Sequence, residues 1–261
     1  MKTVIVALLV TFVAAQEIKS PKVVNGTDSD IRRHPFMVSI RKIEAHHCGG
    51  TIINPEWVLS AAHCLHNPAE IYTVQYGTTV ISGDGPLVVN VSQVIRHEDY
   101  ELDNNYKNDI GLVRLSKPIE VQFDGFMIRL PLYGSYLATG TPATLVGWGL
   151  NATGGVTMPH LQEAKLQVFS NFDCAQLHRT TIHYTNICGG IPEGGRGQCS
   201  GDSGGPLLVD GIVVGIVSWS EKPCTIAPYP GVFTGVSHYI DWISKHTGIN
   251  FKLSMYLRAR G

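Results

Sequence analysis

The sequence predicts an all-β protein. Glycine is frequent, with 28 residues in a chain of 261, as is usual in turn-rich β proteins. Short runs rich in valine and isoleucine recur between Gly, Pro, Asn and Asp, as at Phe36–Ile40, Ile110–Leu115 and Ile212–Val217. Such runs are typical of strands, and many short strands separated by turns form barrels or sandwiches. Helical periodicity is scarce, and one short helix is expected over His238–Lys245.

The remaining strand-like runs are Thr51–Ile53, Trp57–Leu59, Leu87–Val91, Thr144–Val146, Lys165–Phe169 and Pro206–Val209. Proline and glycine cluster at Leu130–Thr141, which indicates a boundary between two barrels. We therefore expect one barrel over residues 23–130 and a second barrel, with the helix, over 131–250. An extension at 251–261 follows, to which no function is assigned.

The composition excludes some classes of partner. The net charge is −1, so the chain offers no basic surface for nucleic acid. Hydrophobic residues make up 44% and charged residues 16%, which is enough apolar material for a core. No segment after the N-terminal region is apolar over the length of a transmembrane helix, so no membrane partner is expected.

The N-terminus resembles a secretion signal. Met1-Lys2-Thr3 supplies a positive charge, an apolar run follows at Val4–Ala15, and small residues precede Gln16. The alternative is a membrane anchor, but this apolar run is too short to span a bilayer. We expect a signal peptide at residues 1–15 and an extracellular, secreted protein.

Six cysteines suit an oxidising destination: Cys48, Cys64, Cys174, Cys188, Cys199 and Cys224. The even count suggests three disulfides, although six cysteines allow fifteen pairings. No Cys-x-x-Cys pair indicates a zinc site. His46-His47-Cys48 is interpreted as a bridged cysteine beside surface histidines rather than a metal site.

Three segments carry residues suited to chemistry: His63 in Ala61–Cys64, Asp109 in Asn108–Leu112 and Ser203 in Gly201–Pro206. Each alone has an ordinary structural explanation, as a packed histidine, an aspartate that starts a strand and a glycine-rich turn. Together they provide the groups for nucleophilic acyl transfer. A serine hydroxyl needs an imidazole to take its proton, the imidazole needs a carboxylate to fix its tautomer, and the oxyanion needs N–H donors.

These segments resemble the trypsin/chymotrypsin-like serine proteases, and the likeness runs from Val23 to about Lys245. It also includes Val23–Gly26, Cys48–Gly50, Gly147–Gly149, Ser218-Trp219 and Gly231–Phe233, with histidine, aspartate and serine in the family's order. The resemblance implies two antiparallel six-stranded β-barrels packed together, a short C-terminal helix and a catalytic site in the cleft between the barrels.

The resemblance also implies residue roles. His63 is the general base and then acid, Asp109 orients it, and Ser203 is the nucleophile. The N–H groups of Gly201 and Ser203 form the oxyanion hole, and Ser218 supports Asp109. The rival hypothesis is a catalytically silent homologue that acts as a binding protein. Because no catalytic residue is replaced, an active endopeptidase that cleaves proteins and peptides is favoured.

The same resemblance implies the pairings Cys48–Cys64, Cys174–Cys188 and Cys199–Cys224. We expect no metal and no cofactor. The segment Gly77–Pro86, where many relatives carry a calcium loop, offers only the carboxylate of Asp84.

Substrate preference is inferred from the pocket position six residues before the nucleophile. Trypsin-like relatives have an aspartate there, and this chain has Gly197. The other expected pocket residues are Gln198, Ser218, Trp219, Ser220 and Gly231, and Gln198 is long enough to shorten the pocket. An uncharged pocket predicts chymotrypsin-like cleavage after apolar or aromatic residues, with trypsin-like or elastase-like specificity as alternatives. Glu193, Arg196 and Glu221 are expected on adjoining loops.

Lys22 precedes the family-like start at Val23, so residues 16–22 are expected to form an activation peptide. Cleavage by a trypsin-like protease would free the amino group of Val23 to pair with Asp202. Protein protease inhibitors are further expected partners, and the enzyme is expected to be a monomer. Of three glycosylation sequons, Asn90 and Asn151 are the expected acceptors, because Asn25 lies beside the new terminus.

Overall fold

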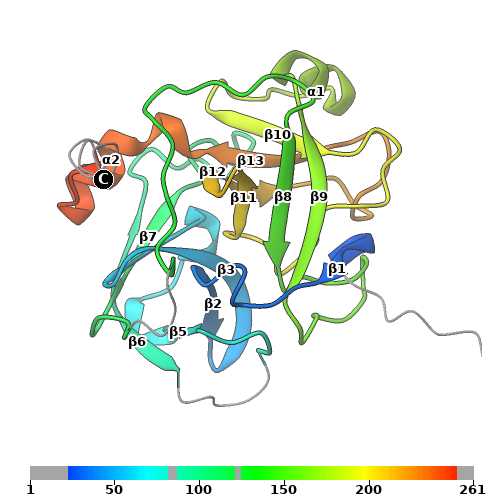
Figure 1. The fold of residues 1–261 in the computed structure, drawn as a ribbon. Helices are drawn as coiled ribbons and strands as arrows, with labels where there is room; N and C mark the ends of the chain where they lie inside the picture. The colour runs from blue at the N-terminus through cyan, green and yellow to red at the C-terminus, as the bar shows by residue number, and fades with distance from the viewer. Residues whose placement is uncertain (1–22, 82–86, 121–124, 252–261) are drawn as a thin grey trace, which may run out of the picture.

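The computed structural model describes residues 23–81, 87–120 and 125–251 (Figure 1). The expected signal peptide, Lys22, Asp84 and the extension from residue 252 onward lie outside these ranges.

The first half of the chain forms a closed antiparallel barrel, shown in blue and cyan in Figure 1. Its strands are β2 (Met37–Lys42), β3 (Ala45–Asn54), β4 (Trp57–Ser60), β5 (Tyr72–Tyr76), β6 (Val88–Arg96) and β7 (Gly111–Leu115). The order around the barrel is β2-β3-β4-β7-β6-β5, and β5 pairs back to β2. No sheet edge is left unpaired by this closure.

The second half forms another closed antiparallel ring, in the order β8-β9-β10-β13-β12-β11, with β9 also pairing to β8. Its strands are β8 (Pro142–Gly147), β9 (Gln162–Phe169), β10 (Asn186–Gly190), β11 (Pro206–Val209), β12 (Ile212–Trp219) and β13 (Gly231–Gly235). The short β1 (Thr27–Asp28) leaves the N-terminal segment and pairs with β9 of this ring. The predicted pair of six-stranded barrels is confirmed.

Buried apolar side chains hold the two barrels against each other. Within the first barrel Val38, Ile40 and Leu112 are fully buried. The same buried cluster includes Trp148 and Leu161 of the second half. Burial of such side chains is the main stabilising contribution to a β domain of this kind. The loops at the junction are therefore fixed by both barrels.

The described residues contain two α-helices. Helix α2 (Ile240–Thr247) overlaps the expected C-terminal helix and ends at Gly248, whose φ of 73° suits glycine. Helix α1 (Asn171–His178) was not expected from sequence, and it starts where the Ser170 hydroxyl accepts a hydrogen bond from the Asp173 N–H. Neither helix has the length and apolar character needed to cross a membrane.

Candidate active site

The two barrels bring His63, Asp109 and Ser203 to their junction. His63 lies in the 3₁₀ turn η2 (Ala62–Cys64) after β4, and Asp109 lies just before β7 of the same barrel. Ser203 comes from the loop before β11 of the second barrel. His63 and Ser203 line one cavity of about 190 Å³, and Asp109 is buried and bonded to His63. The structure therefore joins all three residues singled out from the sequence.

The carboxylate of Asp109 fixes the imidazole of His63. Its Oδ2 lies 2.7 Å from His63 Nδ1, and its Oδ1 accepts the backbone N–H of His63 at 2.9 Å. The Ser218 hydroxyl donates to Oδ2 at 2.6 Å. Because Asp109 can only accept as an anion, His63 carries its proton on Nδ1. The Nε2 atom is left as the ring nitrogen that can take a proton.

The loop around Ser203 depends on left-handed glycines. Gly201 has φ of 91° and Gly204 has φ of 77°, and a Cβ on Gly204 would overlap the Ser60 hydroxyl. The Ser203 carbonyl accepts the N–H of Gly49 at 2.8 Å, which ties the loop to β3.

Two amides of this loop are free to bind an anion. Within the described ranges, the N–H groups of Gly201 and Ser203 donate to no protein acceptor. These are the two donors predicted for an oxyanion hole. Among the described residues, the Ser203 side chain forms no hydrogen bond with His63, although both residues line the cavity.

Asp202 is a second, different buried carboxyl. It is fully buried and accepts two backbone N–H groups, from Gly149 at 2.8 Å and from Cys199 at 2.9 Å. Gly147 and Gly149 pack so closely that a Cβ on either would overlap the carboxyl group. Burial raises the pKa of Asp202 to about 7, and the charge of Lys222 opposes part of this rise. No described residue forms an ion pair with Asp202.

His46 is a site residue that sequence reasoning missed, because it was interpreted as a surface histidine. The structure corrects this: its ring is half-buried, and burial lowers the pKa of His46 to about 4. Its Nε2–H donates to the carbonyl of Gly201 at 2.9 Å, so Nδ1 accepts from the Ser39 hydroxyl at 2.7 Å. His46 thus fixes the carbonyl of Gly201, the residue whose own N–H is a predicted oxyanion donor. Only the fold reveals this, since 155 residues separate the pair.

The cavity beside Ser203 contains part of the predicted pocket. Its other lining residues are Tyr106, Gln198, Cys199, Ser200, Val217, Ser218, Trp219, Ser220 and Lys222. Gly197 and Gly231, which were expected in the pocket, do not line it. Tyr106 and Lys222 were not anticipated. Tyr106 stands edge-on to the His63 ring, with 5.7 Å between centroids.

The three disulfides implied by the resemblance are all present: Cys48–Cys64, Cys174–Cys188 and Cys199–Cys224. The first adjoins His63, and the third joins Cys199, which lines the cavity, to Cys224. Among the described residues, Cys48, His63 and Cys64 form the one cluster with metal-ligand atoms close together, but its two sulfurs are bonded to each other.

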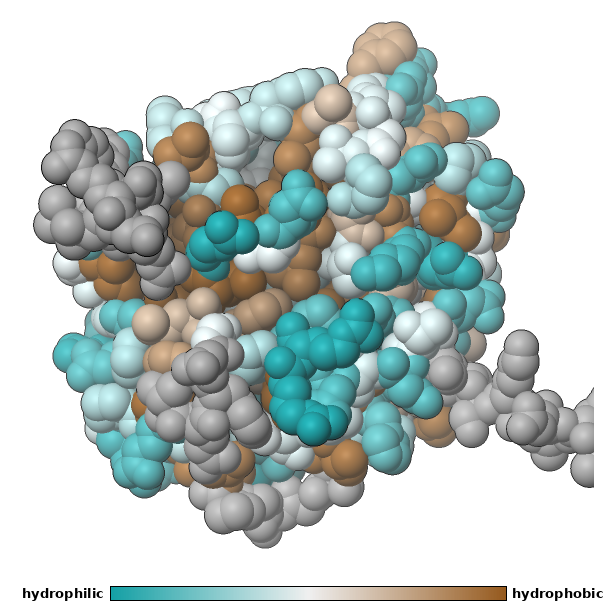
Figure 2. All heavy atoms as spheres, viewed as in Figure 1, coloured by the Kyte–Doolittle hydropathy of each residue, from teal (hydrophilic) through white to brown (hydrophobic). Residues whose placement is uncertain are grey.

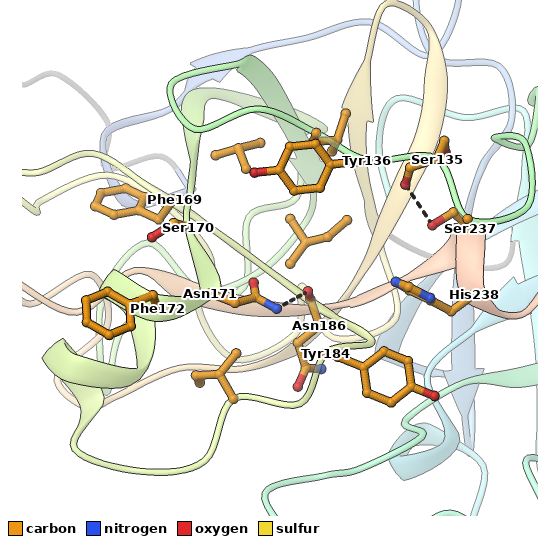
Figure 3. Close-up of a pocket in the computed structure, with 15 residues that line it drawn as sticks. Ser135, Tyr136, Phe169, Ser170, Asn171, Phe172, Tyr184, Asn186, Ser237 and His238 are labelled. Carbon is orange, nitrogen blue, oxygen red and sulfur yellow. Dashed lines mark hydrogen bonds between the residues drawn. The ribbon is translucent and has the colours of Figure 1, made fainter.

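A second groove, of about 480 Å³, lies on the C-terminal barrel (Figure 3). Aromatic side chains gather around it, including Tyr136, Phe172 and Tyr184, with His238 at one end. It contains none of His63, Asp109 and Ser203. The cavity at the barrel junction is therefore the candidate active site.

Figure 2 shows one face of the molecule, where hydrophilic and hydrophobic side chains are interspersed.

The fold is a double barrel. Its site holds a buried aspartate, a histidine hydrogen-bonded to that aspartate, and a serine beside two free amides. This combination defines a serine endopeptidase of the trypsin/chymotrypsin type. Comparison with known proteins agrees. The family model described as Trypsin matches residues 23–243, and the chain belongs to that family.

Several curated relatives match over most of their length. Trypsin II-P29 of Gallus gallus is 36% identical over 225 residues, which cover 86% of this chain and 88% of the relative. Kallikrein-7 of Homo sapiens is 32% identical, with 88% and 89% covered. Serine protease 1 of Rattus norvegicus is 34% identical, with 94% and 98% covered.

Replacement of His46 tests its role in holding the Gly201 peptide. We expect His46→Ala to lower kcat/KM by at least about tenfold, since oxyanion stabilisation depends on donor placement. The control is His160→Ala, which removes an exposed histidine. Peptide hydrolysis and circular dichroism should be measured together. A folded His46→Ala variant with activity within twofold of the parent would contradict this role.

Proposed function

We propose that this protein is secreted as an inactive precursor and that its endopeptidase activity uses His63, Asp109 and Ser203. The observation that carries the proposal is the buried Asp109 carboxylate, which holds His63 at 2.7 Å within the cavity that Ser203 also lines. That arrangement supports nucleophilic acyl transfer because it supplies a base of fixed tautomer beside a hydroxyl.

The reaction follows from these groups. Ser203 Oγ attacks the scissile carbonyl carbon while His63 Nε2 takes its proton, and the resulting oxyanion accepts hydrogen bonds from the amides of Gly201 and Ser203. The tetrahedral adduct collapses as His63 returns the proton to the departing amine, which leaves an acyl-enzyme. Water, deprotonated by His63, then attacks the ester and releases the acid and the free serine.

The alternative of a catalytically silent binding protein predicts a replaced or displaced catalytic group. No catalytic group is replaced, since His63, Asp109 and Ser203 are all retained, and hydrogen bonds hold Asp109 and His63 together. The geometry therefore supports catalysis over binding alone.

Removing a catalytic group should separate these two hypotheses. Ser203→Ala or His63→Ala should lower turnover by about 10⁴-fold or more in a correctly folded protein. A serine-directed sulfonyl fluoride should label the parent at Ser203 and should not label Ser203→Ala. Peptide hydrolysis near the parent rate in both variants would exclude the acyl-enzyme mechanism.

The residue before the cleaved bond is proposed to be apolar or aromatic. No carboxylate lines the cavity among the described residues, and Lys222 lines it, with its Nζ donating to the Ser200 hydroxyl at 3.2 Å. A lysine or arginine bound there would be a cation without a counter-charge, near a second cation.

A panel of peptides that differ only in this residue measures the preference. We expect kcat/KM for Phe, Tyr or Leu to exceed that for Lys or Arg by at least about tenfold. A preference for arginine would contradict an uncharged pocket, and it would direct attention to Glu193 and Glu221.

Activation is proposed to follow cleavage between Lys22 and Val23. The family match begins at Val23. Asn25, two residues further on, donates from Nδ2 to the carbonyl of Gly195 at 2.6 Å. This bond holds the segment after the new terminus against the part of the chain that leads to Ser203. A freed Val23 ammonium would give Asp202 the counter-charge that it lacks, and it would fix the loop that carries Gly201 and Ser203.

A precursor that cannot be cut after Lys22 tests activation. Lys22→Gln should remain nearly inactive after treatment with a trypsin-like protease, whereas the parent should gain activity as the Val23 terminus appears in N-terminal sequencing. Equal hydrolysis by the uncut variant and the cut parent would refute activation, and it would leave the triad proposal standing.

The pKa of Asp202 also predicts how precursor stability depends on pH. An aspartate with a pKa near 3.9 when unfolded and about 7 when folded binds more protons in the folded state between these values. The uncut precursor should therefore lose stability as pH rises from about 4 to 7. Thermal melting should show a smaller loss in this window for the cleaved enzyme and for uncut Asp202→Asn. Identical pH profiles for all three would contradict an unpaired carboxyl.

Secretion, a monomeric state and recognition by protein inhibitors belong to the same proposal. The three disulfides support an oxidising, extracellular location.

Glycosylation is proposed at Asn90, which is exposed on β6, and at Asn151. Asn25 is a poorer acceptor, because its Nδ2 already donates to Gly195.

A further inference from the structure

The side chain of Gln198 crosses the substrate pocket from one wall to the other. Its backbone adjoins Cys199 in the wall that leads to Ser203, and its Nε2 donates to the carbonyl of Trp219 at 2.7 Å in the opposite wall. The hydrogen bond also fixes the orientation of the amide, since only Nε2 can donate to a carbonyl. Only 4% of Gln198 is exposed.

The far side of this amide rests on Gly231. A Cβ added to Gly231 would lie 2.7 Å from Oε1 and 2.8 Å from Cδ of Gln198. Oε1 is buried there without a hydrogen-bond partner. The glutamine therefore starts from the wall that contains Cys199, and its side chain contacts two further sides of the pocket, at Trp219 and Gly231.

The position of Gln198 explains why Gly231 does not line the cavity although Ser218, Trp219 and Ser220 do. The amide separates the space beside Ser203 from this glycine. The cavity of about 190 Å³ includes the region around His63 and Tyr106, so the pocket behind Ser203 is shallow.

We infer that Gln198 is the floor of the substrate pocket and limits the length of the side chain bound before the cleaved bond. Leucine and methionine fit above this floor, and the longer side chains of Phe, Tyr and Trp are bound less well. The inference rests on the proposed function, and within the apolar class it selects aliphatic side chains of intermediate length.

The test uses the cleaved, full-length enzyme and a peptide p-nitroanilide series that varies only in the residue before the cut. Active sites are counted with a sulfonyl fluoride. In the parent, kcat/KM for Leu should exceed that for Tyr by about tenfold or more. In Gln198→Ala this ratio should fall by at least about tenfold, through faster cleavage after Tyr and Trp. Gln198→Ser serves if the alanine variant does not fold, and Gln176→Ala, an exposed glutamine on α1, is the matched control.

A second variant tests the contact with Gly231. Gly231→Ala should slow cleavage after Leu in the parent, because the new methyl group displaces the Gln198 amide. In the Gln198→Ala background the same change should have little effect, since the crowding atoms are gone. Equal effects of Gly231→Ala in both backgrounds would overturn the inference.

The outcomes distinguish the inference from the proposed function. A parent that cleaves after Tyr as fast as after Leu, or a Leu-to-Tyr ratio unchanged in Gln198→Ala, overturns the floor and leaves an apolar pocket in place. Faster cleavage after Arg than after every apolar residue overturns the proposed specificity, and the ratio among apolar residues still reports on Gln198.

Discussion

The buried carboxylate of Asp109 joins the two barrels at the active site. Its acceptor atoms are satisfied from both sides, by the N–H and Nδ1 of His63 from the first barrel and by the hydroxyl of Ser218 from the second. Thr234, also in the second barrel, donates to the Asp109 carbonyl at 2.8 Å. A buried anion is tolerated only when its hydrogen bonds are complete, so the docking of the barrels and the tautomer of His63 depend on one another.

Asp202 shows the opposite condition in the same site. Two backbone N–H groups are too few to compensate a fully buried carboxylate, which is why its pKa rises to about 7. In the proposed activation, the new Val23 terminus supplies the cation that pairs with Asp202. Because the hydrogen bonds of Asp109 are already complete, we propose that the loop carrying Gly201 and Ser203 is the part that changes on activation.

The pocket combines two departures from a trypsin-like arrangement. Gly197 stands where trypsin-like relatives have the anion that binds a basic side chain, and the longer Gln198 beside it bridges to Trp219. The absence of a Cβ at Gly231 is needed for this bridge. Lys222 adds a cation to the lining of the cavity. The charge of the pocket and its depth are thus set by different residues, so that each property can be changed separately by substitution.

Sequence alone determined the strand-rich character of the chain, and through the family resemblance it gave the residues of the proposed triad in their order along the chain. β-branched runs bounded by turn residues predicted strands such as β4, β7, β11 and β12, because a half-buried pleated surface suits those side chains. Strands β1, β5, β10 and β13 were missed. β10 and β13 contain two glycines each, which carry little strand propensity and are used for close packing, as where Gly189 meets Phe233. The cysteine pairing followed from the family resemblance, since the spacing of six cysteines alone left all fifteen pairings open.

Tertiary structure decided everything that depends on contacts between distant segments. His46 was interpreted as a surface residue until the fold placed it against Gly201, and the floor formed by Gln198 exists only because Trp219 and Gly231 meet it from other strands. Periodicity and motifs report what each residue prefers locally. Burial, hydrogen-bond partners and the pKa of a buried acid are properties of the surroundings, and those are set only when the two barrels close and pack.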